Sequence, residues 1–494
     1  MGRKENRKRI AFISIIAAIV LLNAVYALNY PILIDEAGFI DIGNGIVHGL
    51  APYEDFYDNK APGVHYLSAT IIQVFGNSIY LIRLVLLFMN IVTGFMVYKI
   101  SKRLWNSDVG IVAFVLFMLG IVLFANGTLY TEIPLIFLLT LGTLLFLESV
   151  DSGKRIYLFA SGIFFGIGFI MRISAILTLI AIFAFYVLGL YRRENRNLSY
   201  YNKIFIDGIF IVCGFVIPVV IALILFFMMG SLNELIYNSF ILNLFFYPSY
   251  TLIDGAKLYY SNIVAYLFLW VFVVSGFVLI IKNYIFKRSY DKKFAIALFF
   301  FFSMTQLTVA GFAHYFLQAL PYAAMIGSYA LFAFYKEARK SDFMEIFAVI
   351  AITCLLLSSI SIITFTLFRL YDYDALGKQM DVGNYIKSVT GEDERIFILG
   401  SGIEYFFLSD RQPSYRYFFY QPLIEHVYST TDAIESLEEY NVRYIIITDL
   451  HIIGNDDRKS AEEKLAPLYD YIYENYEIDR EFIDVLNLTV YKLK

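Results

Sequence analysis

The chain has 494 residues, of which 59% are hydrophobic and 18% aromatic, and its formal net charge is -4. Its apolar residues occur in runs of roughly 20, the length that a helix needs to cross a bilayer, which excludes a water-soluble globular protein. Both cysteines, Cys213 and Cys354, lie inside apolar runs, which excludes a disulfide framework and a thiolate metal site.

Hydropathy along the chain predicts eleven membrane-spanning helices. They occupy residues 10–28, 78–100, 109–124, 129–148, 156–171, 173–190, 204–229, 262–281, 294–310, 313–335 and 343–368. The first has no small-residue cleavage site of the kind that follows a removed signal peptide, and we expect it to be retained. The predicted fold class is an α-helical polytopic membrane protein, with a transmembrane domain over residues 1–368 and a soluble domain over residues 369–494.

The Lys and Arg positions predict the orientation of these helices. The N-terminus and alternate loops carry 22 basic residues, whereas the opposite set carries only Lys60, Arg83, Arg172 and Lys257. Loops that stay in the cytoplasm retain an excess of positive charge. We therefore predict a multi-pass protein of the cell membrane with a cytoplasmic N-terminus, and the odd number of spans places the C-terminal domain outside the cytoplasm.

The segment after the first span is unusually acidic. "LIDEAGFIDIGNGIVHGLAPYEDFYDNKAPG", residues 33–63, carries six acidic residues and one lysine. Its apolar residues recur at spacings of three or four, which predicts an amphipathic helix lying on the membrane and ended by Gly49. Asp35 could be the N-cap of this helix, and Asp55 and Asp58 could be solvated loop residues.

Three further charges lie where charge is costly. Glu132, in "NGTLYTEIPLIFL", lies at the outer end of the fourth span; Arg172, in "GIGFIMRISAIL", lies between the fifth and sixth; and Arg83 lies near the outer start of the second. Ionisable groups at such depth face a polar cavity or pair with each other. For Glu132 and Arg83 a purely structural ion pair is the alternative.

Carboxylates and cations together at the outer membrane surface suit the transfer of a group from a lipid phosphate. A carboxylate can deprotonate the acceptor hydroxyl while basic residues neutralise the leaving phosphate. In this hypothesis Asp35 is the base, and Lys60 and Arg172 bind phosphate. No nucleotide is needed, because the phosphate ester is itself the activated leaving group.

The C-terminal segment has a different pattern. Residues 395–400, residues 442–450 and the closing "LTVYKLK" predict strands, and residues 429–440 predict a helix with Ser429 or Thr430 near its N-cap. A small α/β domain is expected. Residues 369–494 hold 13 basic and 24 acidic residues, which argues against a nucleic-acid partner and against binding flat to anionic lipid.

The first outer loop resembles that of GT-C glycosyltransferases that use polyprenyl-phosphate sugars, the group of protein O-mannosyltransferases and lipid A aminoarabinose transferase. That pattern is an acidic pair, a G-x-P-Y-x-D turn, a Lys-Pro-Pro-like element, a helix ending in Phe-Gly, and an arginine entering the second span. Here it is met by Asp35 and Glu36; Gly49, Pro52, Tyr53 and Asp55; Lys60, Ala61 and Pro62; Phe75 and Gly76; and Arg83. Ala61 departs from it, because the family often has a first proline there.

Downstream segments are similar to the same family. Glu132 stands where aspartate is commoner, Arg172 replaces a lysine, and "AHYFLQALPYAAMI" carries His314, Tyr315 and Pro321 of a late motif. Arginine in place of lysine can still bind phosphate, and in a bidentate manner.

The resemblance implies an inverting transfer of a sugar to an acceptor hydroxyl. It implies Asp35 as general base, Glu36 and Glu132 as groups that orient the acceptor or adjust the base, and Lys60, Arg172 and Arg83 as donor-phosphate ligands. Tyr53, Asp55, His314 and Tyr315 are candidate substrate contacts, although His314 could equally be a packing residue. The implied partners are a polyprenyl-phosphate sugar and an envelope glycan, glycolipid or protein acceptor.

No catalytic metal or other cofactor is expected, because the transferases that the sequence resembles most are metal-independent. Carboxylate-rich loops nevertheless suit Mg²⁺ or Mn²⁺. Two alternatives of other classes remain: a transporter, which would place its charges at mid-bilayer on broken helices, and a non-catalytic binder of a lipid-linked saccharide. The binder would tolerate Asp35→Asn, whereas the transferase would lose nearly all turnover.

Overall fold

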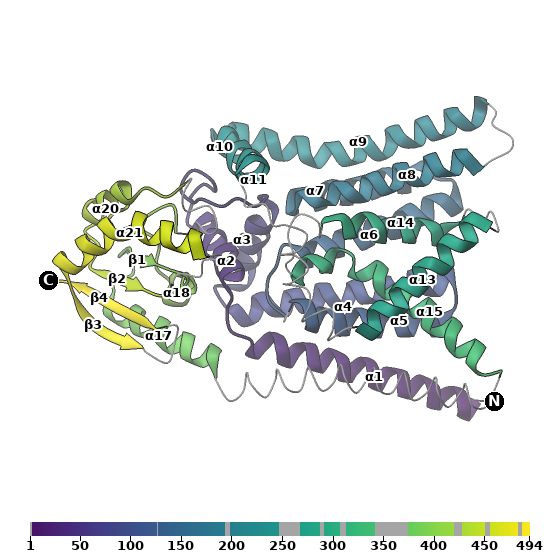
Figure 1. Cartoon of the computed structure of the whole chain (residues 1–494), viewed down its shortest axis with the longest axis horizontal. Coiled ribbons are helices and arrows are strands. Elements are labelled where there is room, and N and C mark those ends of the chain that lie inside the picture. The colour runs from purple at the N-terminus through teal and green to yellow at the C-terminus, as the bar shows by residue number, and fades with distance from the viewer. Residues whose placement is uncertain are drawn as a thin grey trace. The chain divides into compact units, whose positions relative to one another are not determined.

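A computed structural model describes residues 2–125, 127–192, 198–246, 267–286, 291–306, 313–340, 374–418, 427–449, 455–482 and 487–494 (Figure 1). The chain forms two compact units, each assembled from separated segments. The first unit contains residues 1–28, 83–222 and 249–369, and the second contains residues 29–82, 223–248 and 370–494. We describe each unit by itself.

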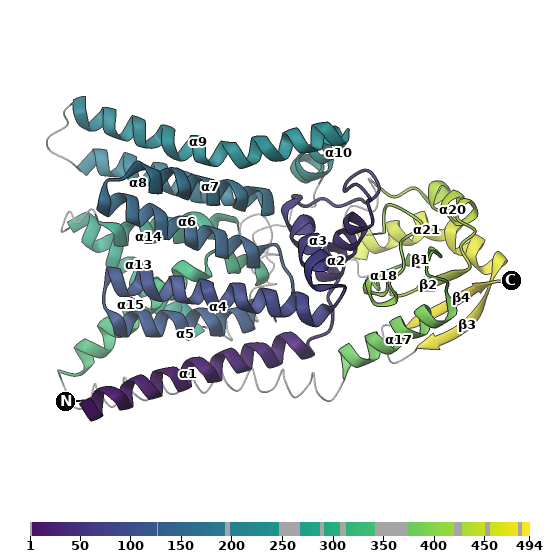
Figure 2. The same cartoon turned by 180° about the vertical axis from the view of Figure 1, so that it is seen from behind.

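The first unit is helical. Its helices are α1 (Gly2–Asn29), α4 (Ile79–Leu104), α5 (Ser107–Ala125), α6 (Glu132–Ser152), α7 (Arg155–Met171), η1 (Ile173–Ala175), α8 (Ile176–Arg192), α9 (Leu198–Met229), α13 (Leu267–Phe286), α14 (Lys292–Thr305), η4 (Ala313–Gln318) and α15 (Leu320–Ala338). Within it, α6 packs on α7, α5 and α13 pack on α15, and α8 packs on α14, and both ribbon views show these helices running side by side (Figures 1 and 2).

Glycines set the closest helix approach in this unit. A Cβ atom added at Gly162 of α7 would lie 2.2 Å from the carbonyl oxygen of Ile211, and one added at Gly214 of α9 would lie 2.2 Å from that of Phe159. Small residues allow helices in a bilayer to bring their backbones together, where dispersion contacts replace the missing hydrophobic drive. Alanine at either position would force α7 and α9 apart.

The predicted polytopic fold class is confirmed. Ten of the eleven predicted spans coincide with described helices, and residues 343–368 lie outside the described residues. By length and composition alone, four described helices suffice to cross a membrane, within α4, α5, α6 and α9, or five if the bent pair Ile13–Asn29 and Ile34–Val47 is one span. The number of crossings stays a prediction.

The second unit begins with two short helices, α2 (Ile34–Val47) and α3 (Gly63–Phe75). A helix after the first span is thus confirmed, and it ends just before Gly49, whose φ of +88° suits glycine. The predicted amphipathic pattern was wrong, because residues 36–45 are buried without interruption as the helix packs against α3 and α18 (Glu404–Ser409). The predicted N-cap was wrong: Leu33 occupies that position, and Asp35 lies in the first turn without capping it.

The C-terminal part of this unit contains a four-stranded sheet. Its strands are β1 (Phe397–Leu399), β2 (Tyr444–Ile447), β3 (Tyr476–Phe482) and β4 (Leu488–Leu493), in the order β1-β2-β4-β3. β1 and β2 are parallel, with Phe397 opposite Ile445, whereas β4 is antiparallel to both of its neighbours. The predicted strands β1, β2 and β4 are confirmed, and β3 was not predicted, because nearly all of its residues are exposed and it has no buried face.

Four helices accompany the sheet: α17 (Ala375–Val389), α18, α20 (Thr430–Glu439) and α21 (Asn455–Asn475). The predicted cap of α20 is confirmed, since the Ser429 side chain accepts a hydrogen bond from the Asp432 N–H. Buried residues of α20 and α21, such as Leu437 and Leu465, form one hydrophobic core with Leu399 and Ile445 of the sheet.

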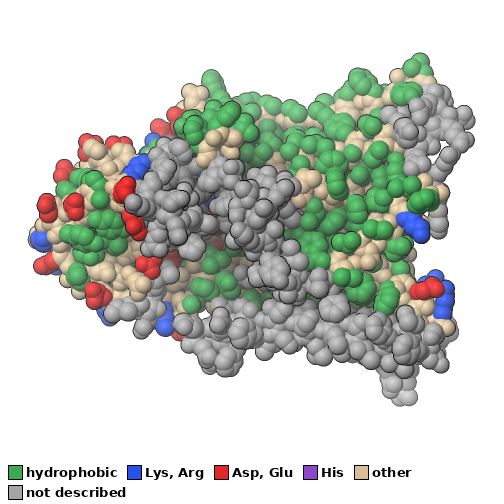
Figure 3. All heavy atoms as spheres, in the orientation of Figure 1, with side chains coloured by type: hydrophobic (Ala, Val, Ile, Leu, Met, Phe, Trp, Pro, Cys, Tyr) green, Lys and Arg blue, Asp and Glu red, His purple; other side chains and the backbone are tan. Residues whose placement is uncertain are grey.

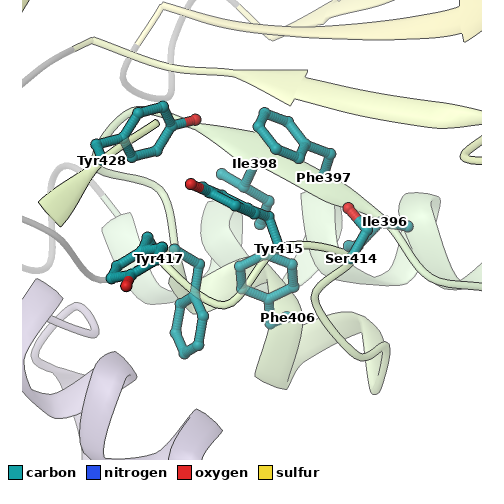
Figure 4. A pocket seen from close by; sticks show the side chains of 9 residues that line it. Ile396, Phe397, Ile398, Phe406, Ser414, Tyr415, Tyr417 and Tyr428 are labelled. Carbon is teal, nitrogen blue, oxygen red and sulfur yellow. The ribbon is translucent and has the colours of Figure 1, made fainter. Parts of the chain in front are cut away.

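An aromatic cluster lies beside β1 (Figure 4). The cluster includes Phe397, Phe406, Tyr415, Tyr417 and Tyr428. The space between these side chains is too small for a water molecule. Its rings meet at centroid distances such as 5.2 Å between Tyr415 and Tyr428, in an edge arrangement that aromatic pairs prefer. We therefore interpret the cluster as core packing and not as a ligand site.

Candidate functional site

Asp35 and Lys60 meet in the second unit. The Lys60 Nζ lies 3.3 Å from Asp35 Oδ1, and the two side chains retain 30% and 34% of their exposure. Asp35 is in the first turn of α2, where the helix dipole favours a carboxylate. Lys60 also lies over the Phe39 ring, 5.5 Å from its centroid. This half-exposed ion pair can therefore meet both a phosphate and a hydroxyl group.

Asp58 and His65 form a buried pair behind Lys60. Asp58 Oδ1 lies 3.5 Å from Lys60 Nζ, and Asp58 Oδ2 lies 3.1 Å from His65 Nε2, although that contact departs from a linear hydrogen bond. Burial opposes ionisation of Asp58, but the Lys60 charge and the His65 contact outweigh it and lower the pKa of Asp58. The prediction that Asp58 is a solvated loop residue was therefore wrong, since its side chain is 2% exposed.

The backbone of Lys60 is held as firmly as its side chain. Its carbonyl oxygen accepts hydrogen bonds from the Tyr53 hydroxyl at 2.6 Å and from the Ser239 hydroxyl at 2.9 Å. Tyr53 is buried with a φ of +69°, and its own carbonyl accepts a bond from Arg416 at 2.7 Å. Tyr53, predicted as a substrate contact, thus lies against Lys60 and orders the loop that carries it.

A second group of carboxylates lies deeper in the same unit. Asp41 of α2 and Glu404 of α18 are both buried, and Gln379 donates a hydrogen bond to Glu404 at 2.9 Å. Burial raises the pKa of Glu404 to about 7. Burial, followed by the nearby Glu404 charge, raises the pKa of Asp41 well above its usual range. Below about pH 7, Glu404 therefore stays protonated where Asp58 is ionised.

Glu132 and Arg172 pair in the first unit, as the sequence suggested for charges at this depth. An Arg172 Nη1 donates to a Glu132 carboxylate oxygen, and Thr131 donates to the other oxygen at 3.0 Å. Glu132 is 1% exposed and Arg172 20% exposed. The guanidinium also lies over the Tyr315 ring, 4.1 Å from its centroid.

A break between two helices exposes Arg172. α7 ends at Met171, Arg172 is extended with a φ of -159°, and η1 follows it directly. The segment that carries Tyr315 is tied to this break, because Gln318 and Ser174 exchange two hydrogen bonds, at 2.6 and 3.1 Å. His314 stacks on Tyr130 with ring centroids 4.5 Å apart. It also contacts the Tyr315 ring edge-on, with centroids 4.8 Å apart.

The remaining predicted site residues lie elsewhere. Arg83 is fully buried in the first unit, and its Nη1 donates to the Ala27 carbonyl at 2.8 Å. Glu36 is buried in α2. Asp55 is exposed and accepts a hydrogen bond from the Ala51 N–H at 2.6 Å, within its own loop. The functional roles predicted for these three residues stay predictions.

Sequence reasoning missed three groups around Lys60: His65, Ser239 and Asn243. Asn243 donates to the Asn59 carbonyl, and Asn59 donates back to the Asn243 side chain at 3.0 Å. The position of Asp58 two residues before Lys60 was the available signal for a local pair. Nothing in the sequence connects residues 239 and 243 with residue 60. In the parts of the chain that the structure describes, no group of three or more His, Cys, Asp or Glu residues could hold a metal ion.

Comparison with known proteins relates these clusters to a family. A family model described as dolichyl-phosphate-mannose-protein mannosyltransferase matches residues 59–229, a range that includes Lys60, Glu132 and Arg172. None of the curated proteins compared with the chain matches it.

Solved structures extend the similarity over nearly the whole chain. ArnT from Cupriavidus metallidurans in the apo state matches with a TM-score of 0.65 at 9% identity, covering 99% of this chain and 98% of ArnT. The same protein bound to undecaprenyl phosphate matches with a TM-score of 0.63 at 10% identity, covering 97% of each chain. The apo oligosaccharyltransferase of Archaeoglobus fulgidus matches with a TM-score of 0.57 at 13% identity, covering 88% of this chain and 69% of that one.

The chain has the GT-C fold. The resemblance drawn from the first outer loop is thereby confirmed at the level of fold. Within the GT-C fold, Asp35 and Lys60 belong to one compact unit, and Glu132 and Arg172 to the other.

Proposed function

We propose that this GT-C chain is a membrane glycosyltransferase that moves a sugar from a polyprenyl-phosphate donor to an acceptor hydroxyl, with inversion, at the outer face of the cytoplasmic membrane. The observation that carries the proposal is the half-exposed Asp35–Lys60 pair, at 3.3 Å, in a fold shared with a protein solved bound to undecaprenyl phosphate. The match of residues 59–229 to a mannosyltransferase family model supports the same reaction class.

Asp35 is the general base in this mechanism. Its carboxylate accepts the proton of the acceptor hydroxyl while that oxygen forms a bond to the anomeric carbon of the sugar. The bond from the anomeric carbon to the phosphate oxygen breaks, and its electron pair leaves with the lipid phosphate. Attack opposite to the leaving group inverts the anomeric configuration.

Lys60 stabilises the negative charge that develops on the leaving phosphate. Hydrogen bonds to ionised groups are stronger than neutral ones, and a cation placed where charge develops stabilises the transition state. In the free protein the ammonium is shared between Asp35 and Asp58. When phosphate takes up the ammonium, Asp35 loses a counter-charge and becomes a stronger base. Arg172, which exposes one fifth of its side chain, is a second cation suited to phosphate.

No cofactor enters these steps, because the lipid phosphate is the activated group. The orientation proposed from the basic loops places residues 369–494 outside the cytoplasm. A reporter fused after Lys494 should then be active only outside the cytoplasm, and cytoplasmic activity would refute this orientation.

The test of the base uses purified protein in vesicles with a polyprenyl-phosphate sugar and an acceptor identified by mass spectrometry of envelope glycans with and without the gene. Asp35→Asn should reduce turnover by roughly 10²- to 10⁴-fold, the usual contribution of a positioned general base. Glu54→Gln is the matched control, because Glu54 is an exposed acid in the same loop. Full activity of Asp35→Asn would reject the base, and binding without transfer by the wild type would favour a non-catalytic binder.

A further inference from the structure

The segment that follows α9 is amphipathic in an unusual way. It comprises α10 (Leu232–Ile236), the π-helical turn η2 (Tyr237–Ile241) and α11 (Leu242–Phe245). Its buried side carries Leu235, Ser239 and Leu242, whereas Leu244 is 77% exposed and Phe245 71% exposed. The exposed side chains of the segment are therefore mainly apolar, although Leu235 and Leu242 pack inward beside Ser239, whereas a helix on a water-soluble protein exposes mainly polar side chains.

This outward apolar face continues that of α9. Phe227 and Met228, in the last turn of α9, are 71% and 76% exposed, and only Gly230 and Ser231 separate the two segments. Gly230 has a φ of +79°, which turns the chain there. Figure 3 shows hydrophobic side chains over α9, α10 and α11. Large exposed apolar patches mark contact with a partner or a membrane.

Lipid is the occupant that this surface fits best. The Tyr201–Met229 stretch of α9 has a mean hydropathy of 3.2 over its most apolar window with only 22% of that window buried, as expected of a helix that faces lipid. Residues 223–246 contain one charged residue, Glu234, and no lysine or arginine. A surface for a soluble partner would carry a polar rim, whereas a segment joined to a lipid-facing helix remains at the bilayer boundary.

The inward side of the segment contacts the loop that carries Lys60. Ser239 donates to the Lys60 carbonyl at 2.9 Å, and Asn243 donates to the Asn59 carbonyl. Ser239 and Asn243 are four residues apart and are joined by a hydrogen bond from Asn243 Nδ2 to the Ser239 carbonyl at 2.9 Å. They lie on one face, because residues four apart are neighbours on a helix. The π-helical turn η2 contains Ser239, and such turns frequently occur at functional sites.

We propose that residues 227–245 form a lipid-contact element, which lies at the boundary between acyl chains and headgroups and fixes the Lys60 loop at that level. Its exposed apolar side chains contact lipid. Through their hydrogen bonds to the carbonyl groups of Lys60 and Asn59, Ser239 and Asn243 fix the backbone of residues 59 and 60 relative to the lipid surface. The lipid contact stands independently of the proposed function; the consequence for Lys60 rests on it.

Depth-dependent fluorescence quenching tests the lipid contact without any activity. In a Trp105→Phe, Trp270→Phe background, Phe245→Trp is placed in vesicles of phosphatidylcholine brominated near the headgroup end of the acyl chains. Tyr473→Trp, at a position 55% exposed in α21, is the matched control. The proposal expects loss of most of the emission at position 245 and almost none at position 473. Equal quenching at the two positions would overturn it.

A second measurement separates lipid from a second copy of the chain. In a Cys213→Ser, Cys354→Ser background, Leu244→Cys should form no disulfide between copies in dilute vesicles; efficient cross-linking would identify an interface between copies and refute the lipid contact.

The link to Lys60 has its own test. Ser239→Ala with Asn243→Ala should raise the donor KM several-fold with little change in kcat, while quenching at position 245 stays unchanged. An unchanged KM in an active enzyme would refute the link alone. Absence of transfer by the wild type would refute the proposed function while the quenching result still stands.

Discussion

The two charged clusters of this chain, Asp35–Lys60–Asp58 and Glu132–Arg172, differ in the exposure and in the number of carboxylates that share one cation. In the second unit, Lys60 is shared by Asp35 and Asp58, and the Lys60 and Asp35 side chains keep about a third of their exposure. In the first unit, Arg172 pairs with the single carboxylate of Glu132, which is 1% exposed, and Tyr315 covers the guanidinium. One cluster is open and has surplus negative charge, whereas the other is closed and balanced.

This difference bears on which carboxylate can react and which one serves to stabilise the fold. A half-exposed carboxylate that shares its cation can give that cation up to a phosphate and then accept a proton. A buried carboxylate matched to one arginine cannot lose that partner without a large cost, because an unpaired buried charge is destabilising. This contrast is the reason that we propose Asp35, and not Glu132, as the base, with Glu132 holding Arg172.

The largest expected effect breaks the closed pair. Arg172→Ala leaves Glu132 buried and unpaired, and we expect a loss of about 3–5 kcal/mol in the free energy of unfolding. Glu132→Gln combined with Arg172→Gln should recover most of this stability and none of the donor use. Thermal unfolding in detergent measures the first effect, and transfer assays measure the second. Equal stability of Arg172→Ala and the wild type would show that the pair is not closed.

Glu404 is a buried carboxyl that forms no ion pair within the described part of the chain, in contrast to Glu132. Burial raises its pKa from 4.5 to about 7. Its stabilising contribution is therefore complete below the unfolded pKa and is lost as the pH rises through the folded pKa. Glu404→Gln stays neutral, so we expect it to be more stable than the wild type at pH 8 by about 3 kcal/mol, with no such gain at pH 4.

The unfolding temperature of Glu404→Gln from pH 4 to 8 measures this gain. Glu435→Gln, at an exposed position of α20, is the control and should change stability little at any pH. If the advantage of Glu404→Gln is the same at pH 4 and at pH 8, its origin is packing and not ionisation.

The open pair should respond differently from Arg172. Lys60→Ala removes a cation whose pair with Asp35 is exposed and contributes only about 0–1 kcal/mol to stability, but the same cation also lies 3.5 Å from the buried Asp58. Because His65 still contacts Asp58 in the variant, we expect a smaller loss of stability than in Arg172→Ala, a strong loss of donor use, measured as kcat/KM, and partial recovery in Lys60→Arg. A loss of stability as large as that of Arg172→Ala would erase the contrast between the two clusters.

Much of the fold could be predicted from sequence, because its signals are local. Apolar runs marked the helices, and the Ser429 cap and the buried strand at residues 444–447 followed from short patterns. β3 escaped because nearly all of its residues are exposed, so it lacks a buried apolar face.

The site was partly predictable for the same reason. Charge at membrane depth singled out Glu132 and Arg172, and the structure pairs them. The alternative that Asp58 is solvated was wrong, because its buried carboxylate meets His65 of α3, a contact that no local pattern indicates. The N-cap expectation for Asp35 failed because residue preference does not fix the register of a helix start, and Leu33 took that position.

The smallest expected effect concerns His65, which lies behind the open pair. His65→Phe removes the 3.1 Å partner of Asp58, so the pKa of Asp58 should rise from its lowered value. Ionised Asp58 stabilises the fold above its unfolded pKa, and this contribution is lost as the pH falls. In the variant, Asp58 should therefore become protonated, and its ion pair with Lys60 should be lost, at a higher pH than in the wild type. We expect the donor KM to rise by up to about fivefold at mildly acidic pH, since the lost polar contact contributes at most the roughly 1 kcal/mol of a hydrogen bond, while kcat stays constant.

The acidic limb of the kcat/KM profile, measured from pH 4 to 8, should move to higher pH in His65→Phe and return toward that of the wild type in His65→Gln, whose amide can still donate to Asp58. His48→Phe is the matched control, because His48 is exposed and its Nδ1 lies 2.8 Å from the Asn44 carbonyl of its own helix. If His65→Phe lowers kcat at every pH and Gln does not restore it, His65 packs the loop against Phe39 and Tyr53 and does not tune Asp58. The open cluster would then owe its charge balance to Lys60 alone.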